Sequence, residues 1–493
     1  MNHKPEPLQH IVVVGQGLVA AGAAVTLAKM LRPFATRISW VQVSTETNKA
    51  GIAGAEVADP ALGRWLEMIG LPEAKLLHQC QGLYSLGAEY RLESKQFFVP
   101  HASHGIQPSP APFEQEFFKR FSGPEQLAFS EHFLATRAAA KARFAFPAKD
   151  PRSARSTLKY GLHLERAALV EAITAHAQNL GVVCQSTDSL QVHGDPQRGI
   201  QALSLDGGIR LEADFFIDAT GESSRLLGQA LGVEFQAQSR SLWPYRITFS
   251  EPAESPLKPR SEFARIAGGW RRRAGLRDKT IVDAWLCDQA ALDRLEASLR
   301  EQGCEFASWQ QTEGARAQGW VYNCLALGGA DAQPGELVLS QWYWACRCLL
   351  LWLELLPSGG DQTHLRAEYN RRRSLLYQRL NEVHWMHAAG VECAHADLPA
   401  DLKWRLDVFT RLGRLWRRDE EVLADEAWLS LALGLGWHAG AYDLTLANID
   451  PKQLAQKHRA IYQTLEREAD TMPFLEAVLK DPTTTRFKQN NDG

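Results

Sequence analysis

The sequence predicts an α/β fold in which a dinucleotide-binding sheet carries an inserted second β-sheet and a helical C-terminal part. Short apolar runs at residues 11–14 and 215–217 end in glycine or other small residues, as buried parallel strands do. Helical patterns dominate from about Trp342 onward. The chain has 493 residues, of which 45% are hydrophobic, and is therefore long enough for large cores.

The first apolar run opens a β-α-β unit. It leads into a G-x-G-x-x-A turn, and a helical pattern over residues 18–31 and a strand at 38–43 follow. In such a turn Gly15 permits the tight bend, Gly17 lets the main chain approach a pyrophosphate, and Ala20 lets the helix pack closely. We therefore expect a dinucleotide at the N-terminus of this helix.

The residue that binds the adenosine ribose is left open. An acid at the end of the second strand normally does so. Here that strand ends at Gln42, and the nearest acid is Glu46. Both residues are candidates, although an amide binds hydroxyls more weakly than a carboxylate.

The second run is followed by D-A-T-G, which adds Asp218 and Gly221 to the cofactor-binding candidates. In FAD enzymes whose dinucleotide domain is interrupted by an insertion, such a strand returns beside the first. The spacing therefore predicts FAD and a two-dinucleotide-binding-domain, glutathione-reductase-like fold with an inserted substrate β-sheet. We assign residues 1–345 to this FAD-binding module and 346–493 to a mostly helical region packed on it.

A third strand and turn at residues 325–330 adds Gly328 to the candidates. FAD proteins of this class end such a strand in Gly-Asp, and the aspartate binds the flavin ribityl chain. Gly329 stands at the aspartate position here, and Asp331 is a candidate to replace it.

Composition argues against several other classes of protein. The net charge of -3 gives no reason to expect a nucleic-acid partner. The eight cysteines contain no C-x-x-C pair, so we expect no metal site and a cytoplasmic protein with reduced thiols. The longest apolar stretch, near residues 349–356, is interrupted by Glu354 and is far shorter than the ~20 residues of a membrane span.

Four further segments carry a resemblance to a known family. The letters YGLHLE at residues 160–165 resemble Y-x-x-H-L-D, and QALGV at 229–233 follows the D-A-T-G strand. YN at 369–370 opens a long helical pattern that carries His387, and WLSLALGLG occupies 428–436. In this order the segments resemble the flavin-dependent tryptophan halogenases and cover most of the chain.

The resemblance implies a flavin chemistry. Reduced FAD would react with oxygen to give a C4a-hydroperoxide, and a halide would attack it. Hypohalous acid would then reach a lysine beside the aromatic substrate, where a glutamate assists. A separate flavin reductase is implied as partner because the sequence shows no NAD(P)H domain. A homodimer is left open.

The chain departs from the family at the chemical residues. Ser85 stands at the lysine position, and only Trp270 remains of a W-x-W-x-I-P signature. The segment P-L-E-S-T-G corresponds to residues 334–339, which keep Glu336 but have Leu337 and Val338 where the family has Ser and Thr.

Three functions follow from these departures. The sequence favours an FAD monooxygenase that hydroxylates a small aromatic or a peptidyl-tryptophan substrate through the hydroperoxide. The alternatives are a halogenase with a rewired site and a non-catalytic flavoprotein or partner-binding relative. Glu336 is the catalytic candidate, expected to lie partly desolvated beside the aromatic residues 342–344 and to accept a proton. A surface-loop carboxylate is the alternative interpretation.

Overall fold

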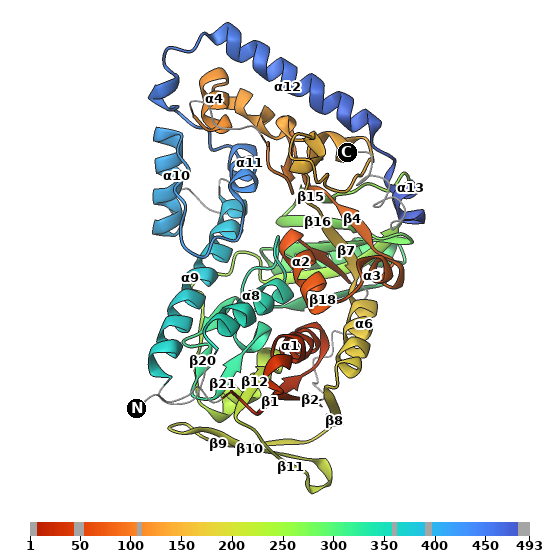
Figure 1. Ribbon diagram of the computed structural model, residues 1–493, viewed down its shortest axis with the longest axis vertical. Helices are drawn as coiled ribbons and strands as arrows, with labels where there is room; N and C mark the ends of the chain where they lie inside the picture. The colour runs from red at the N-terminus through yellow and green to blue at the C-terminus, as the bar shows by residue number, and fades with distance from the viewer. Residues whose placement is uncertain (1–6, 44–53, 106–110, 357–361, 390–396, 482–493) are drawn as a thin grey trace.

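The computed structural model describes residues 7–43, 54–105, 111–356, 362–389 and 397–481. A six-stranded sheet runs in the order β20-β21-β12-β1-β2-β8 (Figure 1). Its strands are β1 (His10–Gly15), β2 (Arg37–Val43), β8 (Val183–Thr187), β12 (Phe215–Ala219), β20 (Trp320–Val321) and β21 (Cys324–Ala326). β1 is buried throughout and pairs in parallel with both β2 and β12. The two apolar runs are therefore neighbouring parallel strands, as predicted.

Helices cover one face of this sheet. α1 (Gly17–Met30) packs on β1 and β2, and it contacts α6 (Arg166–Asn179) and α8 (Gln341–Glu354). A separate antiparallel sheet lies below the six-stranded sheet, at the bottom of the molecule in Figure 1. Its strands are β9 (Leu190–Asp195), β10 (Gly199–Leu205) and β11 (Arg210–Glu212). β10 and β11 form the hairpin expected around Gly207 and Gly208, and both glycines have a positive φ.

The predicted second sheet has seven strands in the order β18-β14-β17-β16-β15-β5-β6. Its pairs are antiparallel except for β15 and β5, which run in parallel. The strands are β5 (Gly87–Leu92), β6 (Lys95–Pro100), β14 (Tyr245–Pro252), β15 (Ser261–Ile266), β16 (Gly269–Gly275), β17 (Lys279–Leu286) and β18 (Phe306–Gln310). The helix α7 (Gln289–Glu301) packs against β14 and β17.

One element differs from the sequence prediction. The helix expected from residue 162 begins only at Arg166, because Gly161–Glu165 forms the strand β7. β7 lies between β3 (Ala55–Ala58) and β4 (Leu83–Ser85). A Cβ on Gly161 would lie 2.2 Å from the carbonyl oxygen of Ala58, so glycine allows the close approach of the two strands. Tertiary pairing thus overrides a helical sequence pattern.

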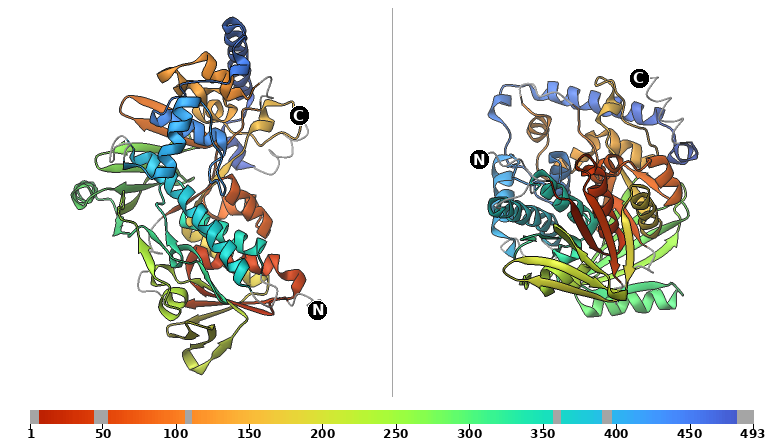
Figure 2. Two further views of the ribbon diagram at one scale, coloured as in Figure 1. Left: turned by 90° about the vertical axis from the view of Figure 1, so that its left-hand side faces the viewer. Right: turned by 60° about the horizontal axis from the view of Figure 1, so that its bottom comes forward.

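The C-terminal part is helical, as predicted. Its helices α10 (Ala400–Leu412), α11 (Asp425–Leu435) and α12 (Pro451–Thr471) lie at the opposite end of the molecule from β9–β11, whereas α8 packs on α1 beside the six-stranded sheet (Figures 1 and 2). α11 packs on β6, and α12 packs on α4 and α5. One large apolar cluster runs from β1 into these helices, and the boundary at residue 345 remains a prediction. The other helices are α9 (Thr363–Ala388) and α13 (Leu475–Lys480), with α2 (Pro60–Ile69), α3 (Glu73–Gln79), α4 (Phe113–Arg120) and α5 (Leu134–Ala140) from earlier in the chain.

The predicted fold class is confirmed: a dinucleotide-binding sheet, an inserted, mostly antiparallel sheet and a helical C-terminal part. Within the described residues, no helix combines the length and the apolar character needed to cross a bilayer. The seven cysteines that the structure describes are all free thiols.

Candidate functional site

The ends of β1, β12 and β21 meet at one edge of the six-stranded sheet, where α/β folds bind nucleotides. Gly15, the last residue of β1, pairs with Ala219 of β12. A Cβ on Gly15 would lie 2.0 Å from the Ala219 carbonyl oxygen, and the φ of Gly15 is +140°. Gly15 is thus required by the contact between the two strands, in addition to the tight turn predicted from the sequence.

Gly17, the first residue of α1, has a φ of +73° and no atom within 4 Å of the position its Cβ would occupy. Gln16, the N-cap residue, makes no side-chain cap, so no capping side chain covers the amides of the first helical turn. Gly221 also has a positive φ and open space at its Cβ position. Open main chain at a helix N-terminus fits the pyrophosphate of a dinucleotide.

Gly328 joins these two glycines from a third loop. It has a φ of +58°, and its Cβ position lies 2.9 Å from a methyl group of Val19 in the first turn of α1. The short helix that it opens, Gly328–Ala330, contacts the turn at Gly221–Ser223. The structure therefore brings Gly17, Gly221 and Gly328 to one place, as a shared cofactor site requires. Ala20 is buried in α1, so it can serve helix packing as the motif implies.

Asp218 lies at this edge, but its carboxylate is fully buried and engaged within the chain. It accepts hydrogen bonds from the Thr220 hydroxyl at 2.6 Å, from the amides of Leu226 and Leu227 at 2.9 and 2.8 Å, and from the Ser224 hydroxyl at 3.2 Å. These bonds fix the turn that contains Gly221. Asp218 therefore affects cofactor binding only by fixing the conformation of this turn.

Asp331 does not replace the family's ribityl-binding aspartate. Its side chain is fully buried, and its Oδ1 lies 2.7 Å from Nη2 of the equally buried Arg373 in α9. This ion pair ties α9 to the loop after β21. The sequence suggested Asp331 from its proximity to Gly329, but proximity along the chain did not reveal which way the side chain points.

The ribose candidates remain untested. Gln42 is half-buried at the end of β2, and its side-chain oxygen accepts a hydrogen bond of 3.1 Å from the Ser186 hydroxyl. Within the part of the chain that the structure describes, no residue accepts a hydrogen bond from its amide nitrogen, a group that can donate to a ribose hydroxyl. Glu46 lies outside the described residues.

Glu336 lies in residues 334–340, the segment that joins β22 (Ala332–Gln333) to α8. The Glu336 side chain is half-buried, and Nε2 of Gln311 donates a long hydrogen bond of 3.4 Å to its Oε1. The same Nε2 donates a hydrogen bond of 2.6 Å to Oε1 of Gln333. Glu336 therefore has a partly desolvated carboxylate beside buried amides.

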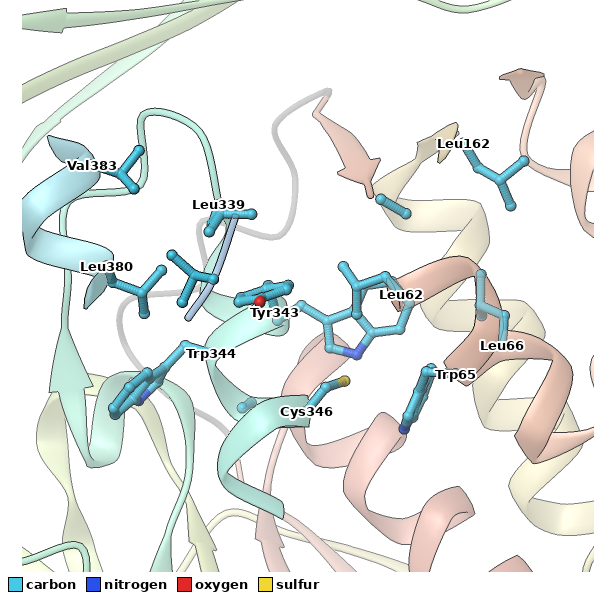
Figure 3. Packing of buried hydrophobic residues seen from close by; sticks show 14 of the residues in the cluster. Leu62, Trp65, Leu66, Leu162, Leu339, Tyr343, Trp344, Cys346, Leu380 and Val383 are labelled. Atoms are coloured by element: carbon cyan, nitrogen blue, oxygen red, sulfur yellow. The ribbon is translucent and has the colours of Figure 1, made fainter. Parts of the chain in front are cut away.

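Apolar packing fixes the segment that carries Glu336. Leu339 gathers with Leu380 and Val383 of α9 beside the first turn of α8, which contains the buried residues Tyr343 and Trp344 (Figure 3). The aromatic residues expected beside Glu336 thus begin α8, and their contact with Glu336 remains a prediction.

Glu56 is an acid at this site that the sequence analysis missed. It is 1% exposed in β3 and accepts a hydrogen bond from the Ser340 hydroxyl, which also caps α8. Burial raises the pKa of Glu56, although Arg166 lies 3.9 Å away, and its charge interacts with that of Glu336. The sequence signal that could have revealed Glu56 is a single glutamate within a short, otherwise apolar strand, Ala55–Ala58.

A buried ionic cluster lies next to Glu336 and was also missed. It consists of Arg246, Glu313 and His384, which we call the Arg246 cluster. Oε1 of Glu313 lies 3.1 Å from Nε2 of His384 and 3.7 Å from Nη2 of Arg246. Burial favours a higher pKa for Glu313, but its interactions with His384 and Arg246 prevail and the pKa is lowered. Wide sequence separation left no local signal for this cluster.

The residues at the family's other chemical positions are held inside the protein. Ser85 is 1% exposed, and its hydroxyl donates to the Gly87 carbonyl at 3.1 Å. Trp270 is fully buried and donates from Nε1 to the carbonyl oxygen of His387 at 3.2 Å. Burial lowers the pKa of His387 to about 3, so its imidazole is neutral at physiological pH.

Known proteins agree with this fold along nearly the whole chain. A family model described as tryptophan halogenase matches residues 10–451. The tryptophan 6-halogenase SttH of Streptomyces toxytricini is 23% identical over 383 residues, which are 73% of this chain and 69% of that protein.

Two of the solved structures similar to this one are flavin-dependent halogenases. BrvH of Brevundimonas sp. BAL3 has a TM-score of 0.87 at 20% identity, covering 96% of this chain and 99% of its own. Xcc4156 of Xanthomonas campestris has a TM-score of 0.85 at 21% identity, covering 96% and 98%.

Proposed function

This chain belongs to the tryptophan halogenase family, a family of enzymes, and from that premise we propose that it is an FAD-dependent halogenase of an indole-type aromatic substrate other than free tryptophan. The observation that carries the proposal is the placement of Glu336, a half-buried carboxylate that accepts a hydrogen bond from the buried Gln311, in the segment against which the His384 ring of the Arg246 cluster packs. Halogenation replaces the hydroxylation that the sequence alone favoured, because the similar proteins are named as halogenases.

The convergent glycine turns fit FAD. Gly15 and Ala20 shape the turn and the packing of α1, and Gly17 offers open main chain to the pyrophosphate. Gly221 and Gly328 lie in contacting turns at the same edge of the six-stranded sheet. When bound in its reduced form, FAD supplies two electrons to oxygen, which allows oxidation of a halide.

The reaction balances without another oxidant. Reduced FAD, oxygen, a halide ion, a proton and an aromatic C–H yield FAD, the aromatic halide and two molecules of water. The C–H bond breaks and a carbon–halogen bond forms. We propose that Glu336 accepts the proton that leaves the aromatic carbon, because it is the partly desolvated carboxylate of the segment.

The substrate is proposed from what the site lacks. Ser85 is uncharged and buried, and its hydroxyl is already hydrogen-bonded, so it supplies no cation at the position where the family has a lysine. Leu337 and Val338 offer a halide no side-chain donor. We therefore propose a small aromatic or peptidyl-tryptophan substrate held by other contacts. A separate flavin reductase would supply reduced FAD, because the described residues form a single six-stranded dinucleotide-binding sheet.

Hydroxylation of the same substrate class is the second candidate, favoured by the loss of the lysine at Ser85 and of the hydroxyls at 337–338. One assay separates the two. The purified protein is supplied with FAD, a flavin reductase, NADH and bromide, together with indole or a tryptophan-containing peptide. Mass spectrometry should find a product with the isotope doublet of bromine. A product that has gained only oxygen would replace halogenation by hydroxylation, and failure to bind FAD would support the non-catalytic alternative.

Glu336→Gln tests the proton acceptor. The substitution keeps size and hydrogen bonding but removes the base, so turnover should fall at least ~10²-fold, as expected for loss of general-base catalysis. The flavin absorption spectrum and the melting temperature should stay close to those of the parent. Glu305→Gln, at an exposed loop position, is the matched control and should leave turnover unchanged. Unchanged turnover in Glu336→Gln would show that Glu336 is a loop carboxylate without a role in proton transfer.

A further inference from the structure

The Arg246 cluster joins three distant parts of the chain in the interior. Arg246 comes from β14, Glu313 precedes β19 (Gly314–Arg316), and His384 lies near the end of α9. Their exposed fractions are 3%, 0% and 2%. All three side chains are thus removed from water.

Stability alone does not account for this cluster. Removing charges from water costs several kcal/mol for each ion, and a buried ion pair can often be replaced by apolar residues without loss of stability. The chain nevertheless places a guanidinium, a carboxylate and an imidazole in one core region. Such an arrangement suggests a functional use for their charges.

The cluster is built onto the segment that carries Glu336. The ring of His384 packs against Gly335, whose Cβ position lies 2.1 Å from the ring, so no larger residue fits there without displacing the ring. The main-chain amide of Gln311 donates to the carbonyl oxygen of Pro244, two residues before Arg246, at 2.8 Å. The side chain of Gln311 in turn donates to Glu336. Gly335, which precedes Glu336, and Gln311, which bonds it, are therefore both in contact with the elements that hold the cluster.

Arg246 is itself held in one orientation. Its Nη1 donates to the carbonyl oxygen of Trp243 at 2.5 Å, and its guanidinium lies 5.6 Å from the centre of the Trp285 ring. Glu313 lies on one side, and the charge of Glu336 also interacts with that of Arg246. A fixed guanidinium whose charge acts on a half-buried carboxylate is suited to restrain the position of that carboxylate.

We propose that Arg246, oriented by Glu313 and His384, is the positioning residue that holds the Glu336 carboxylate in place for proton transfer. This inference rests on the proposed function of Glu336. It assigns to the buried cluster a role in turnover that acts only through Glu336 and is separate from any contribution to folding.

The chain provides a matched control in Arg272. This residue is also buried, lies 5.1 Å from the centre of the same Trp285 ring, and pairs with Asp283 at 2.8 Å. It lies in β16, which β17 separates from β14 in the same sheet. Arg272→Met removes a buried guanidinium of the same kind while the Arg246 cluster stays intact.

The test is a double-mutant cycle of Arg246→Met and Glu336→Gln, with indole and bromide as probes. Arg246→Met should lower kcat about 10-fold or more with little change in KM, because it weakens an interaction used in the proton-transfer step. In the Glu336→Gln background the same change should cost nothing further. Arg246→Lys, which keeps the charge, should retain more activity than Arg246→Met. Arg272→Met should leave kcat near that of the parent.

The outcomes separate the two proposals. If Glu336→Gln has no effect on turnover, the proposed function of Glu336 fails. If Glu336→Gln lowers turnover but the effects of the two substitutions multiply, Arg246 acts independently of Glu336 and the positioning role is wrong. Hydrogen exchange of residues 334–340 gives an answer without any substrate. Exchange should accelerate in Arg246→Met but not in Arg272→Met, and equal exchange in both variants would overturn the inference.

Discussion

The two candidate functional regions of this molecule differ in the groups that form them, which are main-chain groups in one region and side chains in the other. The nucleotide-binding edge consists of main chain: Gly17, Gly221 and Gly328 have positive φ angles and converge from three loops. The site around Glu336 consists of side chains from elements far apart in the sequence, including Gln311 and Arg246.

This difference explains which region keeps the family pattern. A site made of main-chain amides tolerates replacement of most neighbouring side chains, provided that its glycines remain. A site made of side chains changes its chemistry with each substitution. At about 20% identity to similar structures, the chain has the glycine turns predicted for the first region, whereas Ser85, Leu337 and Val338 of the second region depart from the pattern that the resemblance implies.

The largest effect is expected at the main-chain site. Gly17→Val should abolish FAD binding, because the side chain would fill the open space over the first turn of α1. A left-handed φ also costs a β-branched residue roughly 1–2 kcal/mol. Gly303→Val is the control, because Gly303 has a φ of +68° and equally open space but lies beyond α7. Titration with FAD, followed by absorbance, should show binding in the control alone. Parental affinity in Gly17→Val would show that the cofactor lies elsewhere.

The next prediction concerns the rebuilt site. With FAD, a flavin reductase, NADH and bromide, free tryptophan should give no brominated product, because Ser85 supplies no cation and Leu337 and Val338 no side-chain donors. The measurement is mass spectrometry of the reaction mixture. A clear bromotryptophan peak would contradict the distinction between the two regions, since the rebuilt site would then retain the activity for which its relatives are named.

Acid should affect the two regions unequally. Burial lowers the pKa of His163 in β7 to about 4 and that of His387 in α9 to about 3, from 6.5. The unfolded chain therefore takes up these protons first, so stability is greatest above pH 6.5 and falls as the pH drops towards 4. The loss reaches about 1.4 kcal/mol per pH unit for each histidine. Hydrogen exchange at pH 7 and pH 5, corrected for the intrinsic exchange rate at each pH, should show a larger loss of protection in β7 and α9 than in β12. Equal loss in all three elements would contradict this.

The smallest effect is expected at Gln42. If its amide bonds the adenosine ribose, Gln42→Ala removes one neutral hydrogen bond, worth about 0.5–1.5 kcal/mol, and FAD affinity should fall roughly 2- to 12-fold. Fluorescence titration with FAD measures the change. Unchanged affinity in Gln42→Ala together with a loss in Glu46→Gln would assign the ribose to Glu46.

The sequence predicted the main-chain turns of the first region because their signals are local. A glycine at a given position permits a positive φ whatever the rest of the chain does, and an apolar run ending in D-A-T-G predicts a buried parallel strand. The turn at residues 15–20, the strand before Gly221 and the helical C-terminal part were all recognisable from neighbouring residues alone. The fold class followed from their order.

Only the tertiary structure decided how the side chains are used. Asp331 looked like a cofactor ligand but points inward to Arg373, and the strand at Gly161–Glu165 forms because β3 and β4 flank it. Glu313 and His384 meet although they are 71 positions apart in the sequence, and Gln311 bonds Glu336 across 25 positions. Periodicity and glycine positions encode local conformation, whereas the partner of a buried charge depends on which elements pack together.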